Sequence, residues 1–222
     1  DLKGRKEPPR AYSLASSPDE KYIAITVKEE RYTSGSTLYP PLLSPILALR
    51  TPPGTRMVVT GFTGPYKLTD EVRSQNDEIV HICAGSGIVP SFSIIKHDLR
   101  VNDSLKHTLI YSNKKHEDII FKDDFELLEE EFPGRLNVIH TLTREEDTTL
   151  YSDDVRRGRI SEALLREAIG RPDSKAMFVC GPDHHPWQKK AAREKDETLP
   201  TSFLQSVLGY LERLGVPKDR IT

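Results

Sequence analysis

Residues 78–99 read EIVHICAGSGIVPSFSIIKHDL, and this stretch decides the fold class. Glu78–Cys83 is a short apolar run rich in β-branched side chains, which predicts a strand, and Pro90–Leu99 has helical apolar spacing. The turn between them follows the pattern G-x-G-x-x-P, which brings a close backbone and a helix start to one place, as a pyrophosphate requires. A tight strand–helix turn without a ligand is the alternative. The candidate phosphate-binding residues are Gly85, Ser86, Gly87, Ile88 and Pro90.

Strands and helices alternate strictly after this stretch. The expected strands are His107–Tyr111, Leu136–Leu142 and Ala176–Cys180, and the expected helices are Asp118–Phe132, Ile160–Ile169 and Pro200–Leu214. Such alternation predicts right-handed crossovers and a parallel sheet, so the second half is expected to be an α/β Rossmann-like domain. A polar linker near Thr69–Asn76 predicts the domain boundary, with domains at residues 1–72 and 73–222.

The first part of the chain has a different character, rich in Pro, Gly, Ser and Thr. Lys21–Lys28 and Arg56–Gly61 are β-branched runs between turn residues, and both predict strands. The Pro-rich stretch Tyr39–Pro45 predicts a loop that enters at most a short helix. Nothing in this part indicates an α/β pattern.

Composition excludes several classes of protein. The 222 residues carry 32 Lys+Arg and 34 Asp+Glu, and this balance argues against a nucleic-acid partner. No apolar run is long enough for a membrane span, and no signal peptide is recognisable at the start. The two cysteines, Cys83 and Cys180, are too few for a disulfide framework or an iron–sulfur cluster, which favours a reduced, cytoplasmic setting.

The strand ends that follow the glycine turn bear on the choice of nucleotide. No acidic residue follows the second strand where an NAD ribose would be gripped, and the chain has Asn113 and Lys114 there instead. Thr143 and Arg144 follow the third strand. Cations near a ribose can pair with a 2′-phosphate, which favours NADPH, but solvated loop charges are an equal alternative. The choice between NADPH and NADH stays open.

A second turn motif, Cys180-Gly181-Pro182, ends the last expected strand. Strand C-termini line the ligand crevice of a parallel sheet, so Cys180 is expected to face the nucleotide. A buried cysteine that only fills the core is the alternative. His184 and His185 follow this turn, but no third metal ligand is recognisable, so no metal site is expected.

Three motifs in order carry a family resemblance. Arg10-Ala11-Tyr12-Ser13, then G-x-G-x-x-P, then Cys180-Gly181-Pro182 resemble the ferredoxin–NADP⁺ reductase superfamily, and more narrowly the flavoprotein reductase components of bacterial oxygenases. The resemblance runs from about Arg10 to Ile221. It implies an antiparallel flavin-binding β-barrel followed by the NAD(P) domain. Since nine residues precede Arg10 and the chain stops at Thr222, the barrel is expected to be incomplete at its N-terminus and the last strand to be missing.

The resemblance also implies an FAD site in the first domain. Arg10 would meet the FAD pyrophosphate, Tyr12 would lie against the isoalloxazine ring, and Ser13 would hydrogen-bond near flavin N5. The remaining expected FAD contacts are Thr26, Val27, Lys28, Leu43 and Ser44. Cys180 would sit beside the nicotinamide, so Ser13 and Cys180 are the candidate catalytic residues.

The implied activity is electron transfer from NAD(P)H through FAD to an iron–sulfur or haem partner, such as a ferredoxin or an oxygenase component. Two alternatives belong to other classes. One is a nucleotide-binding regulatory module without turnover, and the other is a flavin reductase that releases reduced flavin.

Overall fold

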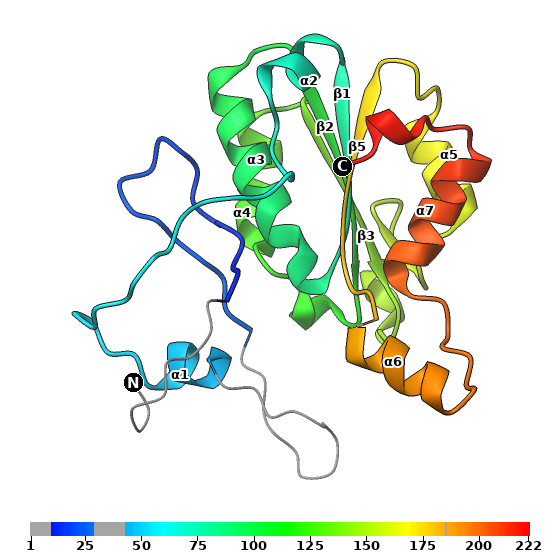
Figure 1. Ribbon diagram of the computed structural model, residues 1–222. Coiled ribbons are helices and arrows are strands. Elements are labelled where there is room, and N and C mark those ends of the chain that lie inside the picture. The colour runs from blue at the N-terminus through cyan, green and yellow to red at the C-terminus, as the bar shows by residue number, and fades with distance from the viewer. Residues whose placement is uncertain (1–9, 29–42, 185) are drawn as a thin grey trace.

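A five-stranded sheet with strand order β4-β3-β2-β1-β5 forms the centre of the computed structural model, which describes residues 10–28, 43–184 and 186–222 (Figure 1). All four strand pairings are parallel. The strands are β1 (Glu78–Ala84), β2 (Lys106–Asn113), β3 (Leu136–Leu142), β4 (Val155–Arg157) and β5 (Lys175–Cys180). The predicted parallel-sheet α/β domain is therefore confirmed.

β1 lies in the middle of the sheet because its sequence is apolar on both faces. Residues 79–84 are all buried, as expected of a strand with neighbours on both sides and helices above and below. The register places Cys83 beside Tyr111 of β2 and beside Cys180 of β5. The strands β2, β1 and β5, which all end at predicted nucleotide residues, are thus adjacent in the sheet with β1 between the other two.

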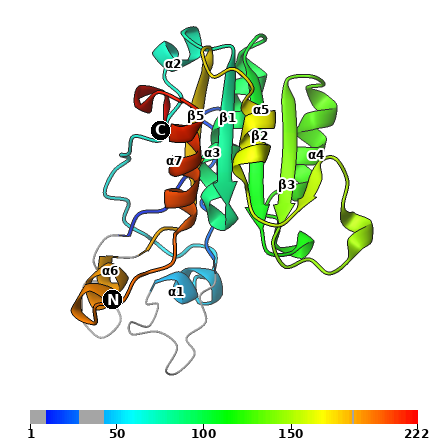
Figure 2. The same ribbon diagram turned by 90° about the vertical axis from the view of Figure 1, so that its right-hand side faces the viewer.

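Helices cover both faces of the sheet. α3 (Ile88–Val101) and α4 (Lys122–Glu131) pack on one face, and α5 (Glu162–Ile169) and α7 (Phe203–Arg213) pack on the other (Figures 1 and 2). α6 (Pro186–Glu194) follows β5, and α2 (Asp70–Ser74) precedes β1. The predicted polar linker at Thr69–Asn76 therefore contains a short helix, which Thr69 caps by accepting from the Val72 N–H.

Two predictions, the start of one helix and the number of strands before the last one, were wrong in detail. The helix expected over Asp118–Phe132 begins only at Lys122, because Phe121 adopts a left-handed φ of 62° that an α-helix cannot contain. Ala176–Cys180 was expected to be the fourth strand, but the short strand β4 (Val155–Arg157) precedes it in the chain. Three residues are too few to show strand periodicity in a sequence.

The C-terminal residues pair with the free edge of β5. Ile221 forms a parallel bridge with Met177, and the Thr222 N–H donates to the Met177 carbonyl at 2.8 Å. The Val179 N–H in turn donates to the Thr222 carbonyl at 2.8 Å. Ile221 and Thr222 therefore lie where a further parallel strand of the sheet would begin.

Neither strand predicted for the first part of the chain forms. Lys21–Lys28 contains only the isolated antiparallel bridge from Leu14 to Ile25, and Arg56–Gly61 contains no strand. No described segment pairs with Arg56–Gly61, and Val58 in it is 91% exposed. A β-branched run needs a hydrogen-bonded neighbour to become a strand.

The β-barrel itself stays a prediction. The short helix expected after the Pro-rich stretch is present as α1 (Ser44–Leu49). Val27 and Lys28, which were predicted to lie in a strand, are at the end of one described range. Residues 29–42, which include most of the Pro-rich stretch, lie outside the described residues. Within the described ranges, no helix is both long and apolar enough to cross a membrane.

Candidate nucleotide-binding site

The glycine turn connects β1 to α3 as a single 3₁₀ turn, Gly85–Gly87. Gly85 has a φ of +53°, in the left-handed region that favours glycine. Gly87 has an ordinary φ of −64° and is required for a different reason. A Cβ at Gly87 would lie 2.3 Å from the Cys180 carbonyl oxygen and 2.9 Å from the Gly181 nitrogen. The glycine turn and the Cys180 turn are therefore in direct backbone contact.

The Cys180-Gly181-Pro182 turn is held equally closely from the other side. A Cβ at Gly181 would lie 2.3 Å from a ring carbon of Phe203 and 3.2 Å from the Ala84 side chain. Phe203 is the first residue of α7, whose start is fixed by a capping box between Ser202 and Gln205. The end of β1, the end of β5 and the start of α7 therefore form one closely packed edge.

Tyr111 supports the glycine turn from below. Its hydroxyl donates to the Gly85 carbonyl at 2.9 Å and accepts from the Ile120 N–H at 3.4 Å. Burial raises the pKa of Tyr111 to about 12, so the hydroxyl keeps its hydrogen. This bond adds to the one that the Gly85 carbonyl accepts from the Ile88 N–H, so two donors hold the carbonyl of the left-handed glycine.

The ends of β2 and β3 are tied to each other at the same edge. The Thr143 N–H and hydroxyl donate to the Asn113 carbonyl at 3.0 and 3.2 Å, and the Arg144 N–H donates to the Lys114 carbonyl at 2.8 Å. Lys114 and Arg144 are exposed, and neither has an ion pair with a described residue. Two exposed cations outside any ion pair among the described residues thus lie on adjoining loops.

One buried group at this edge lacks a partner. The Asn113 side chain is 6% exposed, yet its Nδ2 has no hydrogen-bond partner in the described part of the chain. A buried amide without a partner costs about 1–3 kcal/mol. A ligand oxygen at the end of β2 would remove that cost, so Asn113 fits a binding role.

Cys180 lies half-buried at the end of β5, with Cys83 fully buried beside it on β1. Burial raises the pKa of the Cys180 thiol, and burial raises that of Cys83 to about 12. Both groups are therefore neutral thiols at physiological pH. Cys180 can offer a soft, uncharged contact to a ligand at this edge, and it is not an activated nucleophile.

The predicted flavin residues lie on segments apart from this edge. The bridge from Leu14 to Ile25 brings the neighbours Ser13 and Thr26 onto adjacent chain segments. Arg10, Ser13 and Lys28 are exposed, Tyr12, Thr26 and Val27 are half-buried, and Leu43 and Ser44 lie at the start of α1. No hydrogen bond or ion pair among the described residues joins α1 to residues 10–28, so the FAD contacts of all eight residues stay predictions.

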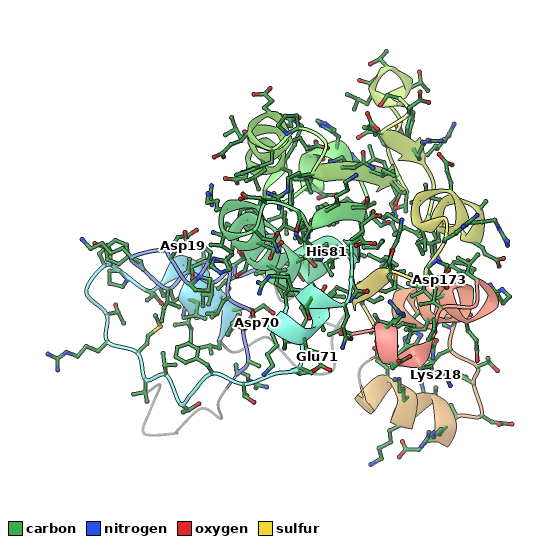
Figure 3. The ribbon with its side chains drawn as sticks, turned by 90° about the horizontal axis from the view of Figure 1, so that it is seen from above. Asp19, Asp70, Glu71, His81, Asp173 and Lys218 are labelled. Atoms are coloured by element: carbon green, nitrogen blue, oxygen red, sulfur yellow. The ribbon has the colours of Figure 1, made fainter. Side chains whose placement is uncertain are left out.

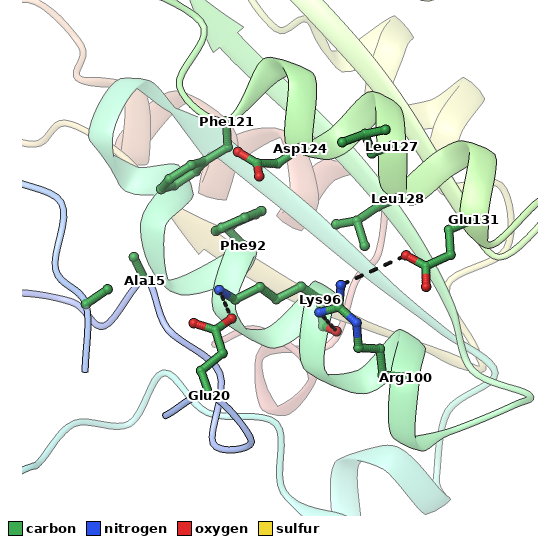
Figure 4. Close-up of a pocket in the computed structure, with 11 residues that line it drawn as sticks. Ala15, Glu20, Phe92, Lys96, Arg100, Phe121, Asp124, Leu127, Leu128 and Glu131 are labelled. Atoms are coloured by element: carbon green, nitrogen blue, oxygen red, sulfur yellow. Dashed lines mark hydrogen bonds and ion pairs between the residues drawn. The ribbon is translucent and has the colours of Figure 1, made fainter. Parts of the chain in front are cut away.

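Residues 15–20 attach the first part of the chain to the outer side of α3. Ser93 donates to the Ser16 carbonyl at 2.7 Å, and His97 lies 2.9 Å from Asp19. Lys96 pairs with Glu20 beside a hollow of about 390 Å³ between this segment, α3 and α4 (Figure 4). The stacked rings of Phe92 and Phe121 line the hollow, with centroids 4.0 Å apart. None of its lining residues belongs to the glycine turn or the Cys180 turn.

Sequence reasoning missed two residues of the edge, Tyr111 and Phe203. Their contacts with Gly85 and Gly181 join residues far apart in the chain, so no local pattern marks them. Among the described residues, no cluster of three His, Cys, Asp or Glu side chains is arranged to hold a metal ion. His184 instead lies 2.5 Å from the Pro200 carbonyl.

Comparisons with known proteins agree with this site. Residues 81–185 match the family model of the oxidoreductase NAD-binding domain. The chain is 28% identical over 166 residues to NADH-cytochrome b5 reductase 2 of Saccharomyces cerevisiae (strain YJM789), covering 72% of this chain and 51% of that protein. It is 36% identical over 103 residues to the NADPH nitrate reductase of Leptosphaeria maculans, covering 46% of this chain and 11% of that protein. The chain thus spans about half the length of the cytochrome b5 reductase and about a tenth of the length of the nitrate reductase.

Solved structures share the fold. The flavohaem-like FAD/NAD-binding domain of nitric oxide dioxygenase from Vibrio cholerae has a TM-score of 0.66 and 21% identity, covering 96% of this chain and 74% of that one. A variant of ferredoxin–NADP⁺ reductase from Plasmodium falciparum has a TM-score of 0.61 and 14% identity, covering 96% and 75%. Residues 81–185 are therefore similar to an oxidoreductase NAD-binding domain, and the chain shares its fold with reductases of the ferredoxin–NADP⁺ reductase superfamily, the resemblance that its motifs predicted.

Proposed function

We propose that this chain is the NAD(P)H-oxidising part of a flavoprotein reductase. The observation that carries the proposal is the contact of Gly87 with the Cys180 carbonyl, which leaves no room for a side chain and joins two ligand-facing turns into one edge. The match to an NAD-binding oxidoreductase domain covers both turns. Relatives named as NADH-cytochrome b5 reductase and NADPH nitrate reductase support an oxidoreductase rather than a module without turnover.

In this proposal the residues of the edge bind and orient the nucleotide. The backbone of Gly85–Gly87 and the first turn of α3 would face the pyrophosphate, since a helix start attracts anions. The Cys180 thiol, kept neutral by burial, would form one wall of the nicotinamide pocket. Its role is to set distance and to exclude water, because hydride transfer from the bound nucleotide to a bound flavin needs alignment and no acid–base pair.

The proposed donor is NADPH in preference to NADH. Lys114 and Arg144 are exposed and outside any ion pair with the described residues, and a backbone hydrogen bond of 2.8 Å joins their loops, so a 2′-phosphate bound there would lie near two cations. Asn113 is the last residue of β2 and immediately precedes Lys114. Its buried Nδ2 has no hydrogen-bond partner among the described residues. A ribose hydroxyl or phosphate oxygen would give that amide the acceptor it lacks.

The proposed second cofactor is FAD, and the proposed acceptor is a separate one-electron carrier. Arg10, Tyr12 and Ser13 carry the FAD part of the proposal, because they match the family motif in order with the two later turns. One relative is named a cytochrome b5 reductase, so a haem protein is the first acceptor to test. A ferredoxin or an oxygenase component is the second.

An anaerobic absorbance spectrum of the purified full-length protein tests the proposal directly. We expect a visible flavin band that bleaches on addition of NADPH and more slowly on addition of NADH. Replacing Cys180→Ala and Ser13→Ala together should slow the bleaching without abolishing NADPH binding. A protein that stays colourless after incubation with FAD and removal of the excess would contradict the proposal and favour a nucleotide-binding module without turnover.

A further inference from the structure

A set of buried polar side chains crosses the sheet beneath α3 and takes no part in the nucleotide site. The Tyr66 hydroxyl lies 2.7 Å from Ser91 Oγ, which lies 3.1 Å from His81 Nδ1. His81 Nε2 lies 3.1 Å from His107 Nδ1. Ser91, His81 and His107 are at most 1% exposed, so bulk water cannot replace a broken link.

The set ends on an ion pair carried by α2. His107 Nε2 lies 2.9 Å from Asp98 Oδ2, and Asp98 Oδ1 accepts from Arg73 Nε at 2.7 Å. Arg73 also pairs with the exposed Asp70 at 2.6 Å. Seen from above, Asp70 lies on α2 toward the outside of the molecule and His81 lies inward of it (Figure 3). We call the whole set the polar row: Tyr66, Ser91, His81, His107, Asp98 and Arg73.

An ionised carboxyl fixes the direction of the hydrogen bonds at the Asp98 end of the polar row. Burial raises the pKa of Asp98, but hydrogen bonds from His107 and Arg73 outweigh it and lower the pKa overall, so the carboxyl is ionised and only accepts. His107 Nε2 therefore donates to Asp98. Ser91 Oγ lies within hydrogen-bond distance of Tyr66 and His81, and also of Cys83 Sγ at 3.2 Å. Burial and His107 lower the pKa of His81 well below its usual value, which keeps this ring neutral.

Both ends of the polar row belong to the segment that enters the NAD domain, residues 66–73. The chain before this segment is exposed, with Met57, Val59 and Phe62 between 61% and 67% exposed. The backbone hydrogen bonds within residues 52–65 are local, such as that from the Thr55 N–H to the Pro52 carbonyl at 3.2 Å. Tyr66 is therefore the first residue after α1 that hydrogen-bonds to the body of the domain, and its ring also packs edge-on against Phe178 at 5.1 Å.

α3, which begins at the glycine turn, supplies Ser91 and Asp98 to the polar row. Ser91 binds Tyr66 on the inner side of α3, while Ser93 binds the Ser16 carbonyl on its outer side. The helix that would face the nucleotide pyrophosphate is therefore fastened on two sides to the part of the chain that carries the predicted flavin residues. A buried hydrogen-bonded chain suits this task, because losing one member leaves its neighbours unpaired and so enforces a single arrangement.

We propose that the polar row is a clamp that holds residues 66–73 against α3 and thereby sets the position of the first part of the chain relative to the nucleotide edge. Ser91, His81 and Tyr66 are positioning residues in this inference, since they touch neither nucleotide nor flavin. The positioning role rests on the proposed function, whereas the clamp itself does not.

Hydrogen–deuterium exchange of the full chain tests the clamp without any cofactor. Tyr66→Phe removes one hydroxyl and keeps the ring, and Ser91→Ala removes the link between Tyr66 and His81. Each should speed exchange within residues 66–73 about fivefold, the factor that corresponds to about 1 kcal/mol for one hydrogen bond. Ser93→Ala, two residues along the same helix, is the matched control and should leave residues 66–73 unchanged while loosening residues 15–20. If residues 66–73 exchange at the wild-type rate in both Tyr66→Phe and Ser91→Ala, the clamp is overturned.

Steady-state kinetics of the flavin-loaded protein test the positioning role. If Tyr66→Phe speeds exchange at residues 66–73, we expect its kcat for NADPH oxidation to fall about fivefold, while its KM for NADPH stays within twofold. Faster exchange with unchanged kcat, or a rise in KM as large as the fall in kcat, would overturn the positioning role. If the protein binds no flavin, the proposed function fails, but the exchange experiment still decides the clamp.

Discussion

Replacing Gly87 by alanine should separate the two turns that form the nucleotide edge. The new Cβ would lie 2.3 Å from the Cys180 carbonyl oxygen and 2.6 Å from its carbonyl carbon. Real Cβ contacts essentially never fall below 3.0 Å, so the turn at the end of β5 must move by at least the difference, 3.0 − 2.3 = 0.7 Å. Gly87 has a φ of −64°, which alanine adopts without strain, so the only obstacle to alanine is the steric clash with the Cys180 backbone.

The size of the effect follows from this overlap with rigid backbone. Overpacking of a close contact costs about 1–3 kcal/mol. For a domain of this size, about 2 kcal/mol lowers Tm by roughly 4–8 °C. NADPH binding should weaken by about tenfold or more, since the pyrophosphate turn and the Cys180 wall no longer keep their spacing.

The matched control is Gly209→Ala. Gly209 lies within α7, and its nearest atom to a new Cβ is Arg213 Nη1 at 3.5 Å, an ordinary contact. Alanine there should stabilise the protein by about 0.5–1 kcal/mol, because glycine is a poor helix former. Thermal unfolding and a fluorescence titration with NADPH measure both variants. A Gly87→Ala protein with wild-type Tm and wild-type NADPH affinity would refute the reasoning.

Three further predictions concern the same half of the chain. Tyr111→Phe removes the 2.9 Å bond to the Gly85 carbonyl and should lower the free energy of unfolding by about 1 kcal/mol in urea titrations; an unchanged midpoint would contradict this. Lys114→Ala combined with Arg144→Ala should weaken NADPH binding about tenfold and leave NADH binding within twofold, and equal losses for both nucleotides would refute the assignment. His140 has its pKa lowered to about 4 by burial, below an unfolded value of about 6.5, so it contributes stability above pH 6.5 that is lost as pH falls toward 4. Between pH 7 and pH 4.5, the free energy of unfolding of His140→Gln should therefore fall by roughly 2 kcal/mol less than that of the wild type. Equal falls in both proteins would show that another group is responsible.

Much of the NAD domain was predictable from residues 78–99 and the alternation that follows. Short apolar strands with helices between them allow few arrangements, because parallel strands need crossovers of one hand. The turn motifs at Gly85 and Cys180 were likewise expected at the ends of adjacent strands, and the register of Cys83 with Cys180 agrees. The strand β4 (Val155–Arg157) and the left-handed Phe121 were not predictable, since neither leaves a periodic signal.

The first part of the chain shows the limit of local patterns. Arg56–Gly61 has the composition of a strand but no described neighbour to pair with, so its side chains stay exposed. Strand formation depends on a second segment, and composition within one segment carries no information about that partner.

The amino-acid sequence alone determined the parallel sheet, the glycine turn and the Cys180 turn, because each depends on residues within one short segment and its spacing. Only the tertiary structure decided that Gly87 must be glycine, since the clashing carbonyl belongs to Cys180 on another strand. Only it joined His81, His107 and Tyr66 into the polar row, from three segments that share one face of the sheet. Side chains on different strands meet through the register of the sheet, and that register is a property of the whole fold.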